Sequence, residues 1–280
     1  MKEIIQGLMV GAVDFHLHVA PDAVKERSVD ACEAALQAKN AGMKGIVFKG
    51  IDYPTAPLAY LAGKVVEGVA VIGSLTLNQA VGGFNPDAVD ASAKLGAKVV
   101  WMPTTSSVGS RKLKGLPGGL SILAGNGEVR AEVKEILSLV GRHDLILATG
   151  HLPQQEVLML FNEAQKHHVS KFVLTHPLKV AGEAIDIQVQ RDLAEKGVYI
   201  EHCFGATLGL SARVKPRQIY EAVKYVGAEK CILSTDLGNF NKPMPAEGMR
   251  IALATLHECG LSEAELELLV KVNPARLLEI

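Results

Sequence analysis

The chain alternates between short apolar segments and longer amphipathic segments, and this alternation recurs eight times. Most of the apolar segments contain three or four consecutive hydrophobic residues, as in Ile46-Val47-Phe48. Continuous apolar runs of this length are typical of strands that are buried on both faces, as parallel strands are. The predicted strands cover residues 12–18, 45–49, 69–78, 97–104, 144–151, 171–176, 197–202 and 230–236.

The amphipathic segments predict the helices that connect these strands. Apolar positions at helical spacing and capping signals place helices at residues 29–40, 128–140, 156–165, 186–195, 216–225 and 246–258, with others starting at Pro86 and after Ser262. Strand followed by helix, eight times over, predicts a (β/α)8 barrel that forms one domain over residues 1–280. An open doubly wound sheet usually has a glycine fingerprint after its first strand, and residues 19–28 contain no glycine.

One connection is longer than the others. The fourth and fifth predicted strands start at residues 97 and 144, and the surplus lies in residues 104–127, which are rich in glycine and serine. In a barrel this stretch would be a loop insertion after strand four, on the face where active sites lie. Its three basic residues, Arg111, Lys112 and Lys114, would either bind an anionic substrate or merely solvate the loop.

Composition excludes several classes of partner. The 280 residues carry 29 Lys and Arg against 30 Asp and Glu, so the basic excess of a nucleic-acid binder is missing. No apolar run reaches the roughly 18 residues of a membrane helix, and residues 1–8 lack the apolar core of a secretory signal. Four cysteines without a CxxC pair favour reduced thiols. We therefore expect a cytoplasmic protein that acts on a small molecule, alone or as a homo-oligomer.

Ionisable residues stand at the ends of the predicted strands. His16 and His18 share one face of the first strand because side chains alternate along it. His151, His176 and Asp236 directly follow the apolar cores of the fifth, sixth and eighth strands. Imidazoles with a carboxylate suit a divalent metal, most readily zinc, with iron and manganese as alternatives. The sequence therefore predicts a metal site at the carboxyl-terminal end of the barrel.

These residues resemble a known family. The DFHLH segment of residues 14–18, together with His151, His176 and Asp236, is similar to the amidohydrolase superfamily of metal-dependent barrel hydrolases. The resemblance covers nearly the whole chain, including the ending NPARLL at residues 273–278. It implies a metal-activated water, with Asp236 as general base and His176 near the substrate, but it does not define the substrate.

The chain departs from the family pattern at strand four. Many two-metal members carry a carboxylated lysine or a glutamate there, where this chain reads VVWMPT. By analogy with one-metal members, the resemblance implies the ligands His16, His18, His151 and Asp236, with His176 near the substrate or as a further ligand.

A two-metal site would need another group as the bridge, and Lys49 or Glu201 could supply it. Lys49 has two other interpretations: an ion pair with a carboxylate or an anionic substrate, or exposure of its amine to solvent. His202, which adjoins Glu201, and Arg111 complete the candidates for binding a substrate or a second ion. The number of ions, one or two, stays open.

Three functions follow from this pattern. The first is a metal-dependent hydrolase that cleaves an amide, a lactone or another ester. The second is a metal-dependent decarboxylase or other lyase on the same scaffold. The third is a metal-binding protein without turnover, because one fold can serve many purposes.

Overall fold

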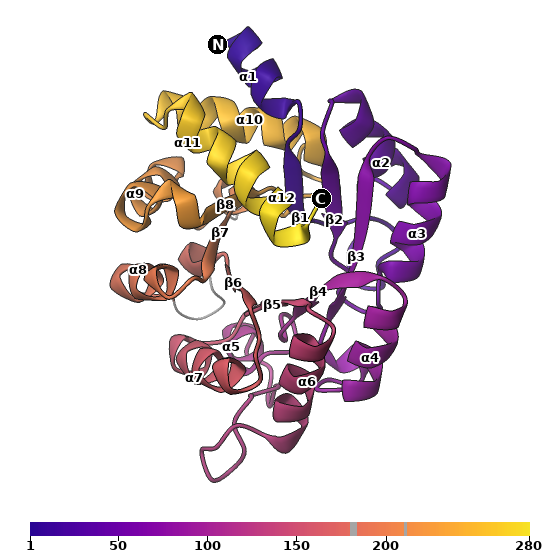
Figure 1. The fold of residues 1–280 in the computed structure, drawn as a ribbon, viewed down its shortest axis with the longest axis vertical. Helices are drawn as coiled ribbons and strands as arrows, with labels where there is room; N and C mark the ends of the chain where they lie inside the picture. Colours follow the sequence, from indigo (N-terminus) through magenta and orange to yellow (C-terminus); the bar gives the residue numbers. More distant parts are fainter. Residues whose placement is uncertain (180–183, 210–211) are drawn as a thin grey trace.

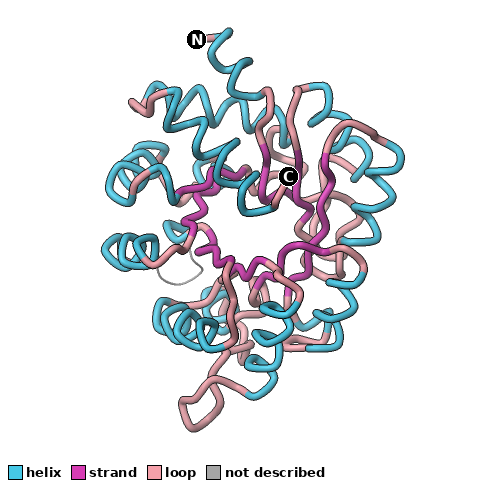
Figure 2. The backbone as a smooth tube through the Cα atoms, in the orientation of Figure 1, coloured by secondary structure: helices cyan, strands magenta, loops and turns pink. Residues whose placement is uncertain are grey.

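The computed structural model describes residues 1–179, 184–209 and 212–280. Eight parallel strands form one sheet, in which each strand pairs with the next along the chain. The strands are β1 (Val13–Leu17), β2 (Gly45–Phe48), β3 (Ala70–Thr76), β4 (Ala97–Trp101), β5 (Ile146–Ala148), β6 (Lys171–Thr175), β7 (Tyr199–Cys203) and β8 (Cys231–Ser234). Figure 2 shows them as a ring with the helices outside it. The predicted (β/α)8 barrel is confirmed.

Backbone hydrogen bonds just beyond the end of β8 close the ring against β1. The Asp236 amide donates to the His16 carbonyl at 2.8 Å, and the His18 amide donates to the Leu237 carbonyl at 2.8 Å. These two bonds fix the main chain at both histidines of the first strand and at the aspartate that follows the eighth. The closure of the barrel is therefore made by the segments that carry three of the predicted site residues.

Most of the helices surround the ring (Figure 1). The helices are α1 (Lys2–Met9), α2 (Ala31–Asn40), α3 (Ala56–Val65), α4 (Pro86–Lys94), α5 (Val108–Leu113), α6 (Ala131–Arg142), α7 (Gln154–Lys166), α8 (Ile187–Glu195), α9 (Pro216–Val226), α10 (Pro245–Glu258), α11 (Glu263–Glu267) and α12 (Asn273–Leu278). Shorter helical turns are η1 (Gln79–Val81), η2 (Pro177–Lys179), η3 (Phe204–Thr207), η4 (Ala228–Lys230) and η5 (Leu268–Val272). The helices α1, α3 and α5 were not among the predicted segments. No described helix is long and apolar enough to cross a membrane.

The stretch between β4 and α6 is not loop alone. It contains α5, whose N-cap Ser107 accepts a hydrogen bond from the Ser110 amide. Two isolated bridges, Ser107 with Leu120 and Leu123 with Val129, fold the rest of the stretch back on itself. The buried Glu156 of α7 accepts hydrogen bonds from the hydroxyl of Ser121 and the amide of Ile122, and so holds the stretch against the barrel.

Apolar side chains fill the barrel interior below the strand ends. One cluster consists of Val13, Phe15, Val47, Ile72, Val99, Trp101, Ile146, Ala148, Val173, Tyr199, Ile232, Leu277 and Leu278. The last two belong to α12, which crosses the amino-terminal end of the barrel (Figure 1). A second, larger apolar cluster lies between the strands and the outer helices. Such packing gives the strand ends a rigid base.

Candidate metal centre

A β-bulge in the first strand turns His16 into the barrel. Between Asp14 and Leu17 the pairing of β1 with β2 shifts by one residue. The rings of Phe15 and His16 both contact Trp101 of the interior, at 5.7 and 4.8 Å between centroids. In a regular strand these consecutive side chains would point to opposite faces. The extra residue of the bulge allows both to point inward.

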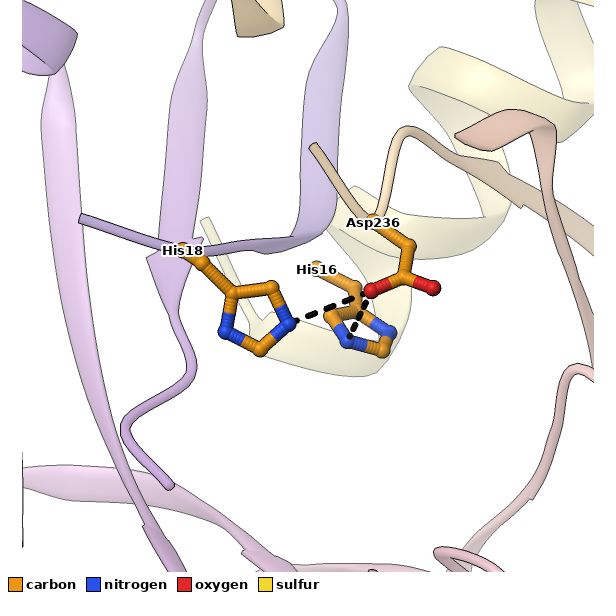
Figure 3. Close-up of side chains that lie close together, drawn as sticks. All are labelled: His16, His18 and Asp236. Carbon is orange, nitrogen blue, oxygen red and sulfur yellow. Dashed lines mark hydrogen bonds and ion pairs between the residues drawn. The ribbon is translucent and has the colours of Figure 1, made fainter. Parts of the chain in front are cut away.

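His16, His18 and Asp236 converge at the carboxyl-terminal end of the barrel (Figure 3). The Asp236 Oδ1 atom lies 3.1 Å from the Nε2 atom of His18 and 3.4 Å from the Nε2 atom of His16. The His16 side chain is fully buried, whereas those of His18 and Asp236 are 9% and 13% exposed. The three donor atoms thus face one point that borders the solvent on the side of Asp236.

The other ring nitrogen of each histidine is held in place. The Nδ1 atom of His18 donates to the backbone carbonyl of Lys49 at 2.7 Å. The Nδ1 atom of His16 lies 3.1 Å from the Oε1 atom of Glu201. The ammonium of Lys49 donates to Nε2 of His16 at 3.1 Å, so this nitrogen carries no proton. The Nε2 atoms of both neutral rings are therefore unprotonated, and they lie 3.4 Å (His16) and 3.1 Å (His18) from Oδ1 of Asp236.

This donor set fits a divalent cation. Donor atoms about 2.0–2.1 Å from one tetrahedral ion lie roughly 3.3 Å from one another, close to the spacings around Asp236. Metal-binding histidines commonly donate their second nitrogen to a carbonyl or carboxylate, as His16 and His18 do. The Nε2 atom of His18 and the Asp236 carboxylate are both acceptors, and a cation between them would remove their repulsion.

Burial shifts the protonation of the groups around this point. It lowers the pKa of His18 to about 3, so the ring is neutral at pH 7. Burial raises the pKa of Glu201 to about 7, although the charge of Lys49 opposes that rise. Burial also raises the pKa of Asp14, on the same strand as His16, to about 7. A neutral imidazole is the form that binds a metal.

Lys49 lies inside the site and does not reach bulk water. Its side chain leaves β2 toward His16, the residue is 4% exposed, and its Nζ atom stands 4.4 Å from the centroid of the Trp101 ring. An ammonium over an indole face is stabilised by the ring quadrupole. Of the three interpretations of Lys49, exposure of its amine to solvent is therefore wrong, while ion pairing and carboxylation stay predictions.

His151 and His176 form a second pair beside the first group. Their Nε2 atoms are 3.2 Å apart, and the rings of His16 and His176 stack with centroids 6.1 Å apart. Nδ1 of His151 lies 2.9 Å from the hydroxyl of Ser110 on α5. Within the described residues, the clusters of potential ligand atoms around His16 do not include His151. The four-ligand set containing His151 remains a prediction.

The remaining candidates occupy different surroundings. His202 is buried beside a cavity of about 10 Å³ that Leu178, Val214 and Ile219 also line. Within the described part of the chain, neither nitrogen of its ring has a hydrogen-bond partner. Arg111 donates to the carbonyl of Pro117 in its own segment. Lys112 and Lys114 are exposed.

Two residues that lie near the site, Cys203 and Ser110, were not predicted from the sequence. The Sγ atom of Cys203 lies 3.5 Å from Nδ1 of His16, so Cys203 and Glu201 flank the same nitrogen. Alternation along β7 was the available signal, because it places residues 201 and 203 on one face. The Ser110 hydroxyl gave no such signal, since α5 brings it to His151 from the connection after β4.

Several solved structures with the same architecture are described as hydrolases. An amidohydrolase from Pseudomonas aeruginosa superposes with a TM-score of 0.65 at 13% identity, covering 99% of this chain and 98% of that one. A probable 2-pyrone-4,6-dicarboxylic acid hydrolase from Acinetobacter baumannii gives 0.65 at 14% identity, covering 97% and 100%. Dipeptidase AC, a metallopeptidase, gives 0.63 at 12% identity, covering 96% and 98%. At such low identities the likeness establishes the fold, and the predicted resemblance to amidohydrolase barrels is confirmed at that level.

The sequence itself matches one family model. A family of unknown function, DUF6282, matches residues 11–201, and the chain belongs to this family. Among curated proteins none matches the sequence. The matched region begins before β1 and ends within β7, so it includes His16, His18, Lys49, His151 and His176 but not Asp236.

Proposed function

We propose that this chain is a metal-dependent hydrolase in which His16, His18 and Asp236 hold a divalent cation. One observation carries the proposal: the unprotonated nitrogens of two histidines and a carboxylate oxygen face one point, with the opposite nitrogens held by fixed partners. Three nitrogen and oxygen donors that leave further positions open suit a catalytic zinc ion, with iron or manganese as alternatives. The proposal covers one ion or two, and His151 and His176 are the donors proposed for a second ion.

Each residue then has a stated task. A bound ion would supply an acidified water and would polarise the bond to be cleaved. Asp236 is the most exposed of the three donors, so its carboxylate can accept the proton of a water and return it to the leaving group. Glu201 and the carbonyl of Lys49 keep the two imidazoles in the tautomer that binds metal. We assign His176, beside His151, the task of orienting the substrate.

An amide, a lactone or another ester is the proposed substrate class. The support comes from proteins of the same fold that are described as a dipeptidase and as a hydrolase of a pyrone dicarboxylic acid. We further propose that the protein acts in the cytoplasm, in keeping with its four free cysteines. The homo-oligomeric state stays a prediction.

The first experiment is metal analysis of the purified protein. We expect one or two equivalents of zinc, iron or manganese in the wild type, and a loss of most of it in the double variant His16→Ala/His18→Ala. His143→Ala is the matched control, because His143 pairs with Asp90 at the turn before β5 and should leave the metal content unchanged. Wild-type protein that binds none of these ions after incubation with each of them would contradict the proposal.

Activity on a panel of dipeptides, lactones and simple esters tests the reaction. Hydrolysis that depends on the added ion and is lost in Asp236→Asn is expected, with metal content reduced less than in the double histidine variant. Carbon dioxide release without uptake of water would identify the lyase predicted as the alternative. Bound metal with no turnover on either type of substrate would favour the protein without catalytic activity.

A further inference from the structure

The carboxylate of Asp14 lies on the outer side of β1, away from the metal centre. It borders a small gap lined by residues of the outer helices, including Ala34 and Ala38 of α2 and Ala246 of α10. Asp14 is fully buried. A buried carboxylate among apolar neighbours is costly unless hydrogen bonds compensate for the lost hydration. The proposed reaction assigns no task to Asp14, so the burial of this carboxylate needs another explanation.

Asp14 accepts three hydrogen bonds, and they come from the two segments that carry the donor atoms. The amide of His16 donates to Oδ1 at 3.3 Å, within the bulge of β1. The amide of Thr235 donates to the same oxygen at 2.9 Å, and its hydroxyl donates to Oδ2 at 2.5 Å. Residue 14 is thus linked to a partner 221 positions later in the chain.

The bond within β1 supports the bulge. A bulge leaves one residue out of the regular ladder, so its amide needs another acceptor. Asp14 provides that acceptor for His16, the residue that the bulge turns inward. Without this acceptor, a regular pairing of β1 with β2 would compete with the bulged one, and it would point the ring of His16 away from the interior.

The bonds to Thr235 support an unusual backbone at Asp236. Asp236 has a φ of 51°, in the left-handed region that residues other than glycine rarely adopt. Such a conformation persists only when its surroundings hold it. Thr235 is held at its amide and hydroxyl by Asp14, and the Asp236 amide donates to the carbonyl of His16. The carboxylate of Asp236 therefore projects from a segment that is fixed on both sides.

We infer that Asp14 is a positioning residue that fixes His16 and Asp236 relative to each other through the β1 bulge and Thr235. The inference rests on the proposed function in so far as these two residues bind metal. It adds that the spacing of the donor atoms is set by a carboxylate that touches neither the ion nor the substrate.

Zinc affinity, measured by competition with a chromophoric chelator, tests this role. Thr235→Val keeps the shape of the side chain but removes the hydroxyl donor, and we expect zinc to bind roughly 10-fold more weakly, as for other outer partners of metal ligands. Thr235→Ser restores the donor and should stay within about 3-fold of the wild type by the same reasoning. Equal affinities in the wild type and Thr235→Val would overturn the inference.

Asn273→Ala is the matched control for a loss of buried hydrogen bonds on the same strand. The side chain of Asn273 donates to the carbonyls of Ala228 and Cys231, at the opposite end of β8. It should lower the unfolding midpoint in urea about as much as Thr235→Val does, without changing zinc affinity. If it weakens zinc binding equally, the effect of Thr235→Val is general destabilisation, and the inference fails.

Hydrogen exchange of the metal-free protein separates this inference from the proposed function. In Asp14→Ala we expect faster exchange in the segments around His16 and Thr235, with little change at the opposite end of the strands. If the wild type binds no zinc, the proposed function fails, but the exchange pattern still decides the role of Asp14. Unchanged exchange in both segments, or equal acceleration everywhere, would refute that role. If Asp14→Ala does not fold, the same exchange measurement on Thr235→Val and Thr235→Ser decides.

Discussion

The two ends of the barrel bury different kinds of side chain: apolar ones at the amino-terminal end and ionisable ones at the carboxyl-terminal end. At the amino-terminal end, Val13, Ile232 and the α12 residues Leu277 and Leu278 belong to an apolar cluster. At the carboxyl-terminal end, buried histidines, carboxylates and Lys49 meet one another. The first end stabilises the fold by burying apolar surface. The second end buries charged groups, which destabilises the fold unless the charges are paired or hydrogen-bonded.

Because of this difference, effects on the free energy of unfolding can be separated from effects on zinc binding. A change at the amino-terminal end should alter the free energy of unfolding and leave zinc binding intact. A change at the carboxyl-terminal end should alter zinc binding, and its effect on unfolding should depend on how tightly the backbone is packed there. The following variants test this division, from the largest expected effect to the smallest.

Gly238→Ala should have the largest effect. Gly238 has a φ of 118°, and a Cβ atom at this position would stand 1.9 Å from the carbonyl oxygen of His18. We expect loss of zinc binding and a destabilisation of about 3–5 kcal/mol, because both strain and a backbone clash are introduced. Gly197, before β7 at the other end, has a φ of 98° and nothing within 4 Å of such an atom.

Gly197→Ala is therefore the control for Gly238→Ala. It should cost about 1–2 kcal/mol from the left-handed backbone alone and leave zinc affinity unchanged. Urea unfolding and zinc titration of both variants make the comparison. Similar zinc affinities in the two alanine variants would show that the contact with His18 is not needed for the site.

Leu278→Ala should destabilise the protein by about 2–5 kcal/mol, because it opens a cavity in the cluster that closes the amino-terminal end. Leu278 is 1% exposed and belongs to α12, away from the donor atoms. Zinc affinity measured well below the unfolding transition should equal that of the wild type. A weaker affinity would mean that the two ends of the barrel are coupled through the interior.

His202→Leu should make the protein less sensitive to acid. Burial lowers the pKa of His202 in the folded state to about 4 from an ordinary value of 6.5. Between these values the unfolded chain binds more protons, so stability is lost as the pH falls through this window. The wild type should lose about 2 kcal/mol more than the variant between pH 8 and pH 5. Unfolding in urea at both pH values measures the difference, and equal losses would exclude His202 as the source.

Lys49→Met should raise the zinc affinity, and this is the smallest effect expected among these variants. The ammonium of Lys49 donates to the His16 nitrogen that would face the ion, so its positive charge opposes binding. We expect zinc to bind roughly 10-fold more tightly, equivalent to about 1.4 kcal/mol, while Lys49→Arg keeps the charge and the wild-type affinity. Weaker binding and the loss of one equivalent of zinc in Lys49→Met would instead indicate a carboxylated lysine that bridges two ions.

The sequence by itself determined the number of strands, their order and the end at which the chemistry is placed. Apolar runs mark each strand because a buried strand needs hydrophobic side chains along its length. The residues that follow those runs, such as His176 and Asp236, lie at the same end because parallel strands share their direction. These features depend on residues close together in the chain, so periodicity and spacing reveal them.

Only the tertiary structure decided how the site is held together. Three features depend on the register between distant strands. They are the bulge that turns His16 inward, the contact of Glu201 with the His16 ring, and the hydrogen bond from Thr235 to Asp14. Register is set by the pairing of backbone groups from segments as far apart in the chain as His16 and Asp236, and one residue of shift reverses the face of every side chain after it. The pattern of residue types along the chain does not reveal this pairing, because these segments meet only when the barrel closes.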